Sequence, residues 1–275
     1  MTTARKSPYI IVLGNEKGGT GKSTLSMHLI MSLLHEGYKV GSIDVDARQG
    51  TLTRYIENRE ITQGKESHEL KMPIHRPIHK STNPNQAEAE AEDTKNVQET
   101  FESLAKNDFI VVDTPGSDMY LSRLVHARAD TLITPLNDSF IDLDMLVRLK
   151  EGAVENARPS TYAEMVWEQK KTRAIADGGS IDWIVLRNRL SSIKAKNKVQ
   201  MEGVLSKLSK RLGFRYYPGF GERVIFRELF LSGLTLLDLE ALGENMTISH
   251  VTARQELRNL LGMINLPELK NKIAA

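Results

Sequence analysis

Lys17-Gly18-Gly19-Thr20-Gly21-Lys22-Ser23-Thr24 is the stretch that decides the fold of this chain. It follows the apolar run at 9–13 and precedes a helical pattern at 22–36. A strand, a glycine-rich turn and a helix in this order form a cradle for phosphate, because backbone N–H groups and the positive end of the helix face the anion. We therefore predict a nucleotide-binding loop, with Lys22 reaching the β- and γ-phosphates of ATP and Ser23 holding Mg²⁺.

One position of this loop departs from the usual pattern, which has a glycine five residues before Gly21. Glu16 stands there, and a second lysine, Lys17, follows it. If Lys22 already serves the phosphates of its own subunit, Lys17 is available for the nucleotide of another subunit. It would then supply charge in trans as an arginine finger does, a contribution on the order of 10³–10⁵ in rate. This interpretation predicts an ATP-dependent homodimer, and the alternative is an exposed lysine that only attracts the ligand.

The composition is that of an ordinary globular chain, with 40% apolar and 26% charged residues and a net charge of +2. The absence of cysteine excludes disulfides, thiolate zinc sites and iron–sulfur clusters ligated by this chain. The polar N-terminus shows no signal peptide, and no apolar run approaches the roughly 20 residues that span a bilayer. We expect a cytoplasmic location.

Strand and helix patterns alternate along the rest of the chain. Strands are expected at 9–13, 39–44, 109–113, 131–135, 181–186 and 214–217, with a short extended piece at 235–239. Helices are expected at 22–36, 96–105, 120–128, 139–151, 193–212, 223–232 and 249–264. This order predicts an α/β fold, a doubly wound and mostly parallel sheet flanked by helices. We expect a single P-loop ATPase domain over 1–275, with 57–94 as an irregular surface insertion.

Acidic residues follow two of these strands. In an open α/β sheet the ligand lies beyond the carboxyl ends of the strands, where Asp44, Asp46 and Asp113 fall. We assign Ser23, Asp46 and Asp113 to the metal site, with Asp113 acting through a water, and Asp46 also to the attacking water. Asp44 would support the Mg²⁺ indirectly, and the Gly116 N–H would reach the γ-phosphate. Taken singly, each acid can equally be a helix cap or a surface residue.

These segments together resemble the deviant Walker A ATPases of the ParA/MinD family, and in particular those that position the division plane. The resemblance covers nearly the whole chain outside 57–94 and the last residues. The residues that carry it are Gly14 to Ser23, Ile43-Asp44, Asp46, Arg48-Gln49, Asp113 to Gly116, Pro135, Asn137 to Phe140, Asp182-Trp183, Leu186 to Leu190, Arg227 to Phe230 and Gly233 to Leu239.

The resemblance implies a slow ATPase that dimerises around ATP and Mg²⁺, with Lys17 acting across the dimer and Asn188 contacting the adenine. The whole loop, Lys17, Gly18, Gly19, Thr20, Gly21, Lys22, Ser23 and Thr24, together with Gly116, would bind the nucleotide, and Lys17, Lys22 and Asp46 would act in hydrolysis. The resemblance also implies inhibition of an FtsZ-like division protein and contact with a ParB-like partition protein. The alternative within the same fold is a ParA-like partition ATPase that moves DNA. From the residues alone, Asn188 can equally be a turn-forming residue.

The segment 187–227 is more basic than the rest of the chain. We predict non-specific DNA contact, and hence association with the nucleoid, through Arg187, Lys194, Lys196, Lys198, Arg223 and Arg227. No base-reading motif is present, so the contacts are expected to be with phosphates. The alternative is a solvated helix face. The apolar stripe of the last helix, which includes Leu257 and Leu260, is more typical of core than of a membrane anchor, so no stable membrane binding is expected.

Overall fold

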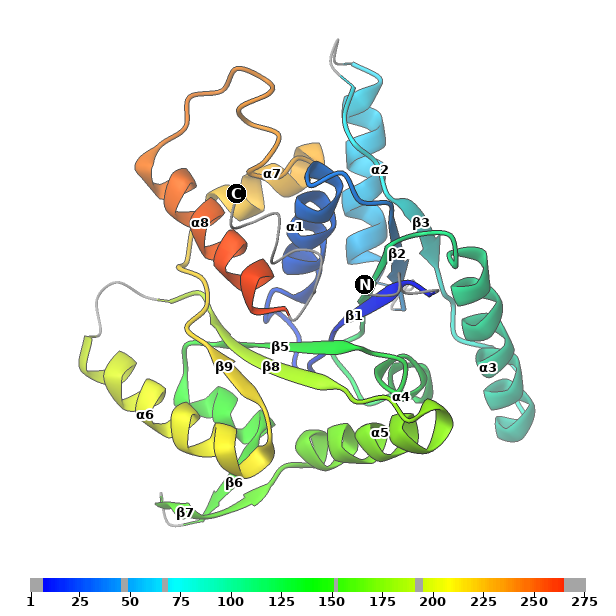
Figure 1. The fold of residues 1–275 in the computed structure, drawn as a ribbon, viewed down its shortest axis with the longest axis vertical. Coiled ribbons are helices and arrows are strands. Elements are labelled where there is room, and N and C mark those ends of the chain that lie inside the picture. Colours follow the sequence, from blue (N-terminus) through cyan, green and yellow to red (C-terminus); the bar gives the residue numbers. More distant parts are fainter. Residues whose placement is uncertain (1–6, 46–48, 66–68, 151–152, 191–194, 265–275) are drawn as a thin grey trace, which may run out of the picture.

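The computed structural model describes residues 7–45, 49–65, 69–150, 153–190 and 195–264 (Figure 1). Seven parallel strands form one sheet in the order β3-β2-β4-β1-β5-β8-β9. Their bounds are β1 (Tyr9–Leu13), β2 (Val40–Asp44), β3 (Ile74–Pro77), β4 (Phe109–Asp113), β5 (Thr131–Asn137), β8 (Asp182–Asn188) and β9 (Arg215–Tyr217). The predicted fold class is confirmed.

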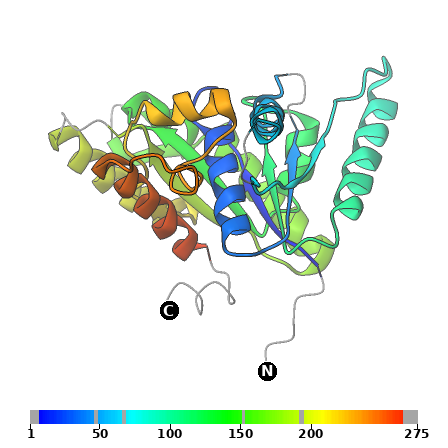
Figure 2. The ribbon, with the colours of Figure 1, turned by 90° about the horizontal axis from the view of Figure 1, so that it is seen from above.

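Helices cover both faces of the sheet because its strands alternate their side chains between two cores. In β1, Val12 belongs to one core while Ile11 and Leu13 belong to the other. The helices are α1 (Lys22–His35), α2 (Thr51–Gln63), α3 (Gln86–Ser103), α4 (Tyr120–His126), α5 (Thr161–Asp177), α6 (Ala195–Leu212), α7 (Ile225–Ser232) and α8 (Ile248–Met263). α1, α2, α7 and α8 pack on one face and α4, α5 and α6 on the other, with α3 and α6 at opposite ends of the molecule (Figures 1 and 2).

The register of the sheet brings the carboxyl ends of three strands level. Leu13 pairs with Asp113 on β4 and with Ile133 on β5, and Asp44 of β2 also pairs with Asp113. The loop that follows Leu13 therefore lies at the same edge as the acids that end β2 and β4. In the described residues no helix is long and apolar enough to cross a membrane.

The interpretation of 57–94 as an irregular insertion is wrong. This span contains the second half of α2, the edge strand β3 and the first half of α3. The strand was hard to recognise because prolines bracket it, and proline is tolerated at the edge of a sheet, where one side needs no hydrogen bonds. The start of α3 is capped by the Asn85 side chain, which accepts from the N–H groups of Ala87 and Glu88.

The predicted helix at 139–151 is also wrong. A short 3₁₀ helix, η1 (Phe140–Met145), is followed by an antiparallel hairpin of β6 (Val147–Lys150) and β7 (Ala153–Pro159). The helix α5 follows in a span for which no helix was predicted, and the Ser160 hydroxyl caps it by accepting from the Ala163 N–H. Residues 235–239 form a turn rather than an extended piece, closed by the Asp238 carboxylate on the Thr235 N–H.

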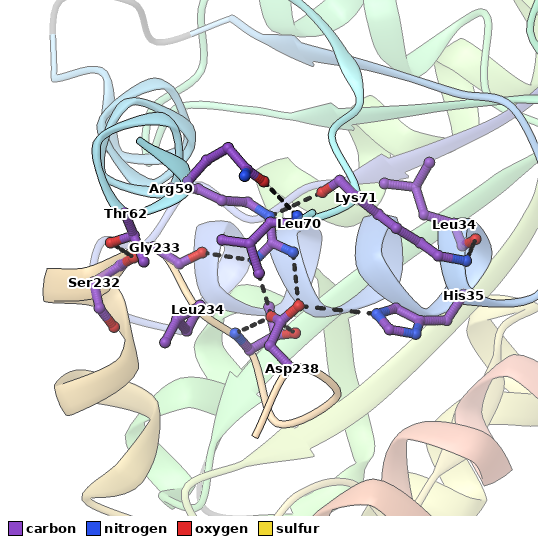
Figure 3. Close-up of polar contacts among 12 residues, drawn as sticks. Leu34, His35, Arg59, Thr62, Leu70, Lys71, Ser232, Gly233, Leu234 and Asp238 are labelled. Carbon is purple, nitrogen blue, oxygen red and sulfur yellow. Dashed lines mark hydrogen bonds and ion pairs between the residues drawn. The ribbon is translucent and has the colours of Figure 1, made fainter. Parts of the chain in front are cut away.

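A buried ion pair joins α2 to this turn (Figure 3). The Arg59 guanidinium is fully buried and donates to both carboxylate oxygens of Asp238, at 2.8 and 2.6 Å. It also donates to the carbonyls of Lys71 at 2.9 Å and Gly233 at 3.0 Å. His35, at the end of α1, lies 3.9 Å from Asp238. The two ends of this contact are 179 residues apart in sequence, so the pair fixes α2 against the connection between α7 and α8.

Candidate nucleotide site

The conformation of the loop after β1 is fixed by its glycine backbone and by hydrogen bonds from neighbouring side chains. Gly19 and Gly21 have φ of 71° and 90°, a left-handed conformation that costs glycine little. The Asn15 side chain donates to the Pro135 carbonyl at 2.7 Å and accepts from the Lys17 N–H at 2.6 Å. At Gly21 a side chain would clash with the Asn188 amide, since an added Cβ would lie 2.2 Å from Nδ2. The loop can therefore present its N–H groups to an anion.

A cavity of about 690 Å³ lies over this loop. Most of the residues predicted to bind the nucleotide line it, and the lining considered in the sequence analysis comes from three separate segments of the chain. These lining residues are Gly18, Gly19, Thr20, Gly21, Lys22, Ser23, Thr24, Asp44, Asp113, Thr114 and Gly116. The structure adds Gln49, Thr51 and Arg189, to which the sequence analysis gave no role in the nucleotide site. Thr51 is the first residue of α2, the helix that follows the strand ending in Asp44. Its position at the start of that helix is the signal that could have found it.

Two lysines flank the loop, but they lie differently. Lys22 is buried, lines the cavity and donates from Nζ to the Lys17 carbonyl at 3.1 Å. Lys17 is outside the cavity lining, and its ammonium pairs with Asp142 of η1. The Asp142 carboxylate is almost fully buried and its other oxygen accepts from the Asn137 N–H at 2.9 Å. Lys22 is thus placed for phosphates of its own subunit, and Lys17 is not.

The floor of the cavity suits a divalent cation. The Ser23 hydroxyl donates to Asp113 Oδ2 at 2.5 Å, and Ser26 donates to Oδ1 at 3.2 Å. Burial, together with the negative charge of Asp44, raises the pKa of Asp113 to about 7. A buried carboxylate held beside a second acid is a strained arrangement that a bound cation relieves, and the oxygen donors present are those that Mg²⁺ prefers.

Asp44 has partners of its own, as expected for an indirect role. Its Oδ2 accepts from the N–H and the hydroxyl of Thr53, at 2.9 and 3.0 Å. Thr53 lies in the first turn of α2, and its hydroxyl also contacts His75 of β3 at 3.0 Å. Asp46, the residue predicted to orient the attacking water, lies outside the described residues.

Gly116 lies directly against the loop. An added Cβ there would come within 3.0 Å of the Gly18 N and 3.1 Å of its Cα. A larger residue would therefore require the backbone to shift, and Gly116 lies in the lining of the cavity directly after β4.

A second cavity adjoins the first and shares Gly21, Thr24 and Arg189 with it. Its walls are mainly apolar and come from α1, α7, α8 and the segment after β9. The lining includes Leu25, His28, Asn188, Phe220, Phe226, Leu236, Ala253 and Leu257. Asn188, predicted to contact the adenine, lines this cavity and donates to the Thr20 carbonyl at 2.8 Å. An apolar slot joined to a phosphate cradle can take the nucleoside.

Two of the described residues that were predicted to bind DNA are largely buried in ion pairs. Arg187 is fully buried at the end of β8 and pairs with Asp138 and with Glu202, the latter at 3.3 Å. Its assignment to a DNA surface is therefore wrong, because its charge is neutralised by ion pairs inside the molecule. A count of basic residues in the sequence cannot show this. Arg223 is mostly buried and held by Glu256 at 2.6 and 2.9 Å.

Arg227 is exposed on α7. Lys194 lies outside the described residues, and so do the side chains of Lys196 and Lys198.

Comparison with known proteins places the chain among positioning ATPases. The family model for the ATPase MipZ matches residues 9–268. A carboxysome distribution maintenance protein A from Halothiobacillus neapolitanus is 27% identical over 175 residues, which are 62% of this chain and 71% of that protein.

Two solved structures show the same fold at low identity. The ATP complex of a single-residue variant of McdA from Cyanothece has a TM-score of 0.58 and 19% identity, covering 89% of this chain and 100% of that one. The septum site-determining protein MinD from Pyrococcus horikoshii, complexed with Mg-ADP, has a TM-score of 0.54 and 17% identity over 94% of this chain and 99% of that one.

Proposed function

The chain belongs to the MipZ ATPase family, and on that premise we propose that it is an ATP-dependent dimerising switch that regulates the placement of the division site. In this proposal the ATP-bound dimer binds DNA without sequence preference, inhibits polymerisation of an FtsZ-like protein and interacts with a ParB-type partition protein. Hydrolysis returns the dimer to monomers and so limits the lifetime of the inhibitor.

The position of Lys17 carries the proposal. Its side chain is 39% exposed and its ammonium is paired with Asp142. Lys17 is not part of the cavity lining, whereas the rest of the loop, from Gly18 to Thr24, is. A cation so placed has no phosphate to neutralise within its own subunit. In a dimer that buries two nucleotides between facing loops, it would meet the phosphates of the partner and supply charge in trans.

The chemistry inside one subunit rests on positioning and charge. We assign the phosphates to the loop N–H groups and Lys22, the terminal phosphate also to the Gly116 N–H, and the attacking water to Asp46. Mg²⁺, when bound, would neutralise charge on the phosphates, and Ser23 and Asp113 would hold it with Asp46. These roles are supported by the shared cavity and by the oxygen-rich contact between Ser23 and Asp113.

DNA contact is assigned to the start of α6 and to α7. Lys194, Lys196 and Lys198 follow the end of β8, and Arg227 is exposed on the neighbouring helix. Each phosphate contact should lower log K by roughly 0.9 per tenfold rise in salt. Reversing the charge of the three lysines should abolish binding, whereas Lys95→Glu on α3, whose side chain is 74% exposed, should not.

The decisive test is the oligomeric state. With ATP and Mg²⁺, Asp46→Ala should accumulate as a dimer by light scattering, while Lys17→Ala should stay monomeric and hydrolyse ATP at no more than about a thousandth of the wild-type rate. Lys95→Ala serves as the matched lysine control. A Lys17→Ala chain that dimerises and hydrolyses normally would remove the basis of the proposal.

A ParA-like partition ATPase is the second candidate, and the same dimerisation and DNA results would fit it. Sedimentation of FtsZ polymers with and without the ATP-loaded Asp46→Ala dimer separates the two. A loss of polymer mass supports the regulator, and unchanged polymer mass favours partition.

A further inference from the structure

His28 lies on α1, one helical turn beyond Thr24, and is only 2% exposed. Its Nδ1 lies 2.9 Å from the Thr24 carbonyl. A carbonyl oxygen only accepts hydrogen bonds, so Nδ1 carries the proton and Nε2 presents a lone pair. Burial lowers the pKa of His28 to about 4, which keeps the ring neutral at physiological pH.

The Nε2 atom is buried and has no hydrogen-bond partner among the described residues. Buried polar atoms are nearly always paired, because an unmet acceptor loses its contact with water and gains nothing in return. Since Nδ1 faces back along its own helix, Nε2, at the far end of the ring, points away from α1. There the ring meets the edge of Phe226, with the two ring centres 5.0 Å apart.

His28 and Phe226 both line the apolar cavity that adjoins the phosphate loop. Leu236 and Leu257 add apolar wall, and the polar side chains of the lining are Thr24, Asn188, Arg189, Glu222, Arg223 and Arg227 besides His28. A nucleotide whose phosphates lie over the loop must send its sugar and base past Gly21 and Thr24, which line both cavities. His28, with its unpaired acceptor, therefore lies against the part of the site that the base would enter.

We propose that His28 Nε2 accepts a hydrogen bond from the exocyclic amino group of adenine and thereby selects ATP over nucleotides without a donor at the six-position. Guanine and hypoxanthine carry a carbonyl there, which would face the lone pair and repel it. The inference rests on the proposed nucleotide switch, and it adds a specificity-determining residue that does not touch the phosphates.

The test varies the ligand and the protein together. Binding of ATP and of purine riboside triphosphate, which has hydrogen in place of the amino group, is measured by calorimetry on the wild-type chain. One neutral hydrogen bond corresponds to a preference for ATP of roughly 10-fold. In His28→Leu the preference should fall to within about twofold, through weaker ATP binding rather than tighter binding of the analogue.

His126 provides a matched control. It is equally buried, its Nδ1 lies 2.6 Å from the Ser122 carbonyl, and its Nε2 is also unpaired, but it is not among the residues that line the cavity. His126→Leu should keep the full preference. The comparison of ligands on the wild-type chain needs no variant, so a misfolded His28→Leu does not prevent the test.

Equal binding of ATP and the analogue by the wild-type chain would overturn the role of His28 while leaving the switch intact. An undiminished preference in a folded His28→Leu would do the same. A wild-type chain that binds neither nucleotide would instead overturn the proposed switch and this inference with it.

Discussion

Replacing Asp238 by asparagine should be among the most destabilising conservative changes in this chain. The carboxylate is 4% exposed and faces the fully buried guanidinium of Arg59. Asparagine has nearly the same shape, so the change removes the negative charge and leaves the Arg59 cation buried without a counterion. The Thr235 N–H and hydroxyl, now at 2.7 and 2.8 Å from Asp238 Oδ2, would also lose a charged acceptor.

The expected loss of stability is about 3–5 kcal/mol, the usual cost of breaking a buried pair by removing one partner. Whole domains are stabilised by about 5–15 kcal/mol, so roughly a fifth or more of the total stability is at stake. Burial alone would raise the pKa of Asp238, but hydrogen bonds from His35 and Arg59 hold it well below the usual value. The pair therefore contributes fully above the unfolded pKa of about 4, and the contribution is lost as pH falls below it.

Urea unfolding followed by circular dichroism at pH 7 measures the change in the free energy of unfolding. Arg59→Met and the double variant complete a double-mutant cycle. The double variant should be less destabilised than the sum of the single changes, because no charge is then left unpaired. Arg254→Ala is the matched control, since its pair with Glu240 is exposed and should contribute less than about 1 kcal/mol. A loss below about 1 kcal/mol for Asp238→Asn would refute the reasoning.

Three further outcomes follow from the nucleotide site. Asp142→Asn should release Lys17 and so lower the protein concentration at which light scattering detects the ATP-bound dimer. The decrease should be no more than about fivefold, because the ion pair is partly exposed. A raised concentration would contradict this. Lys22→Ala should weaken ATP binding at least roughly 10-fold in calorimetry, since a charge-assisted contact is lost; unchanged affinity would contradict its role. Asp113 has a pKa of about 7 and must lose its proton to bind a cation. The Mg²⁺ affinity measured by calorimetry should therefore fall roughly tenfold for each pH unit below 7. Asp113→Asn should remove this pH dependence.

The sheet and the phosphate loop could be predicted from the sequence because their signals are local. Strands buried on both faces read as continuous apolar runs, as at 109–113, and the loop glycines stand at fixed spacing. The acid Asp113 was placed correctly because the carboxyl ends of parallel strands share one edge. These features need only neighbours in sequence to be recognised.

The remaining features depend on contacts between distant segments. Arg187 looked like part of a basic surface, and only the fold shows it buried beside Asp138. His28 stood among leucines and methionines of a helix, where nothing in the pattern separates a packed ring from one that faces a cavity. The first strand of the hairpin, β6, was predicted as part of the helix at 139–151 because Val147 and the leucines before it also fit a helical stripe.

The helix α2 links the two cavities of the site. Its first residue, Thr51, lines the phosphate cavity. Arg59, two turns later, forms an ion pair with Asp238 in the turn that also contains Leu236, a residue that lines the second cavity. At Gly233 an added Cβ would lie 2.0 Å from the Arg59 backbone N, so this turn is pressed directly onto the helix. The separation of eight residues corresponds to about 12 Å of rigid helix. One continuous helix therefore connects a wall of the phosphate cavity with the turn that supplies Leu236 to the second cavity.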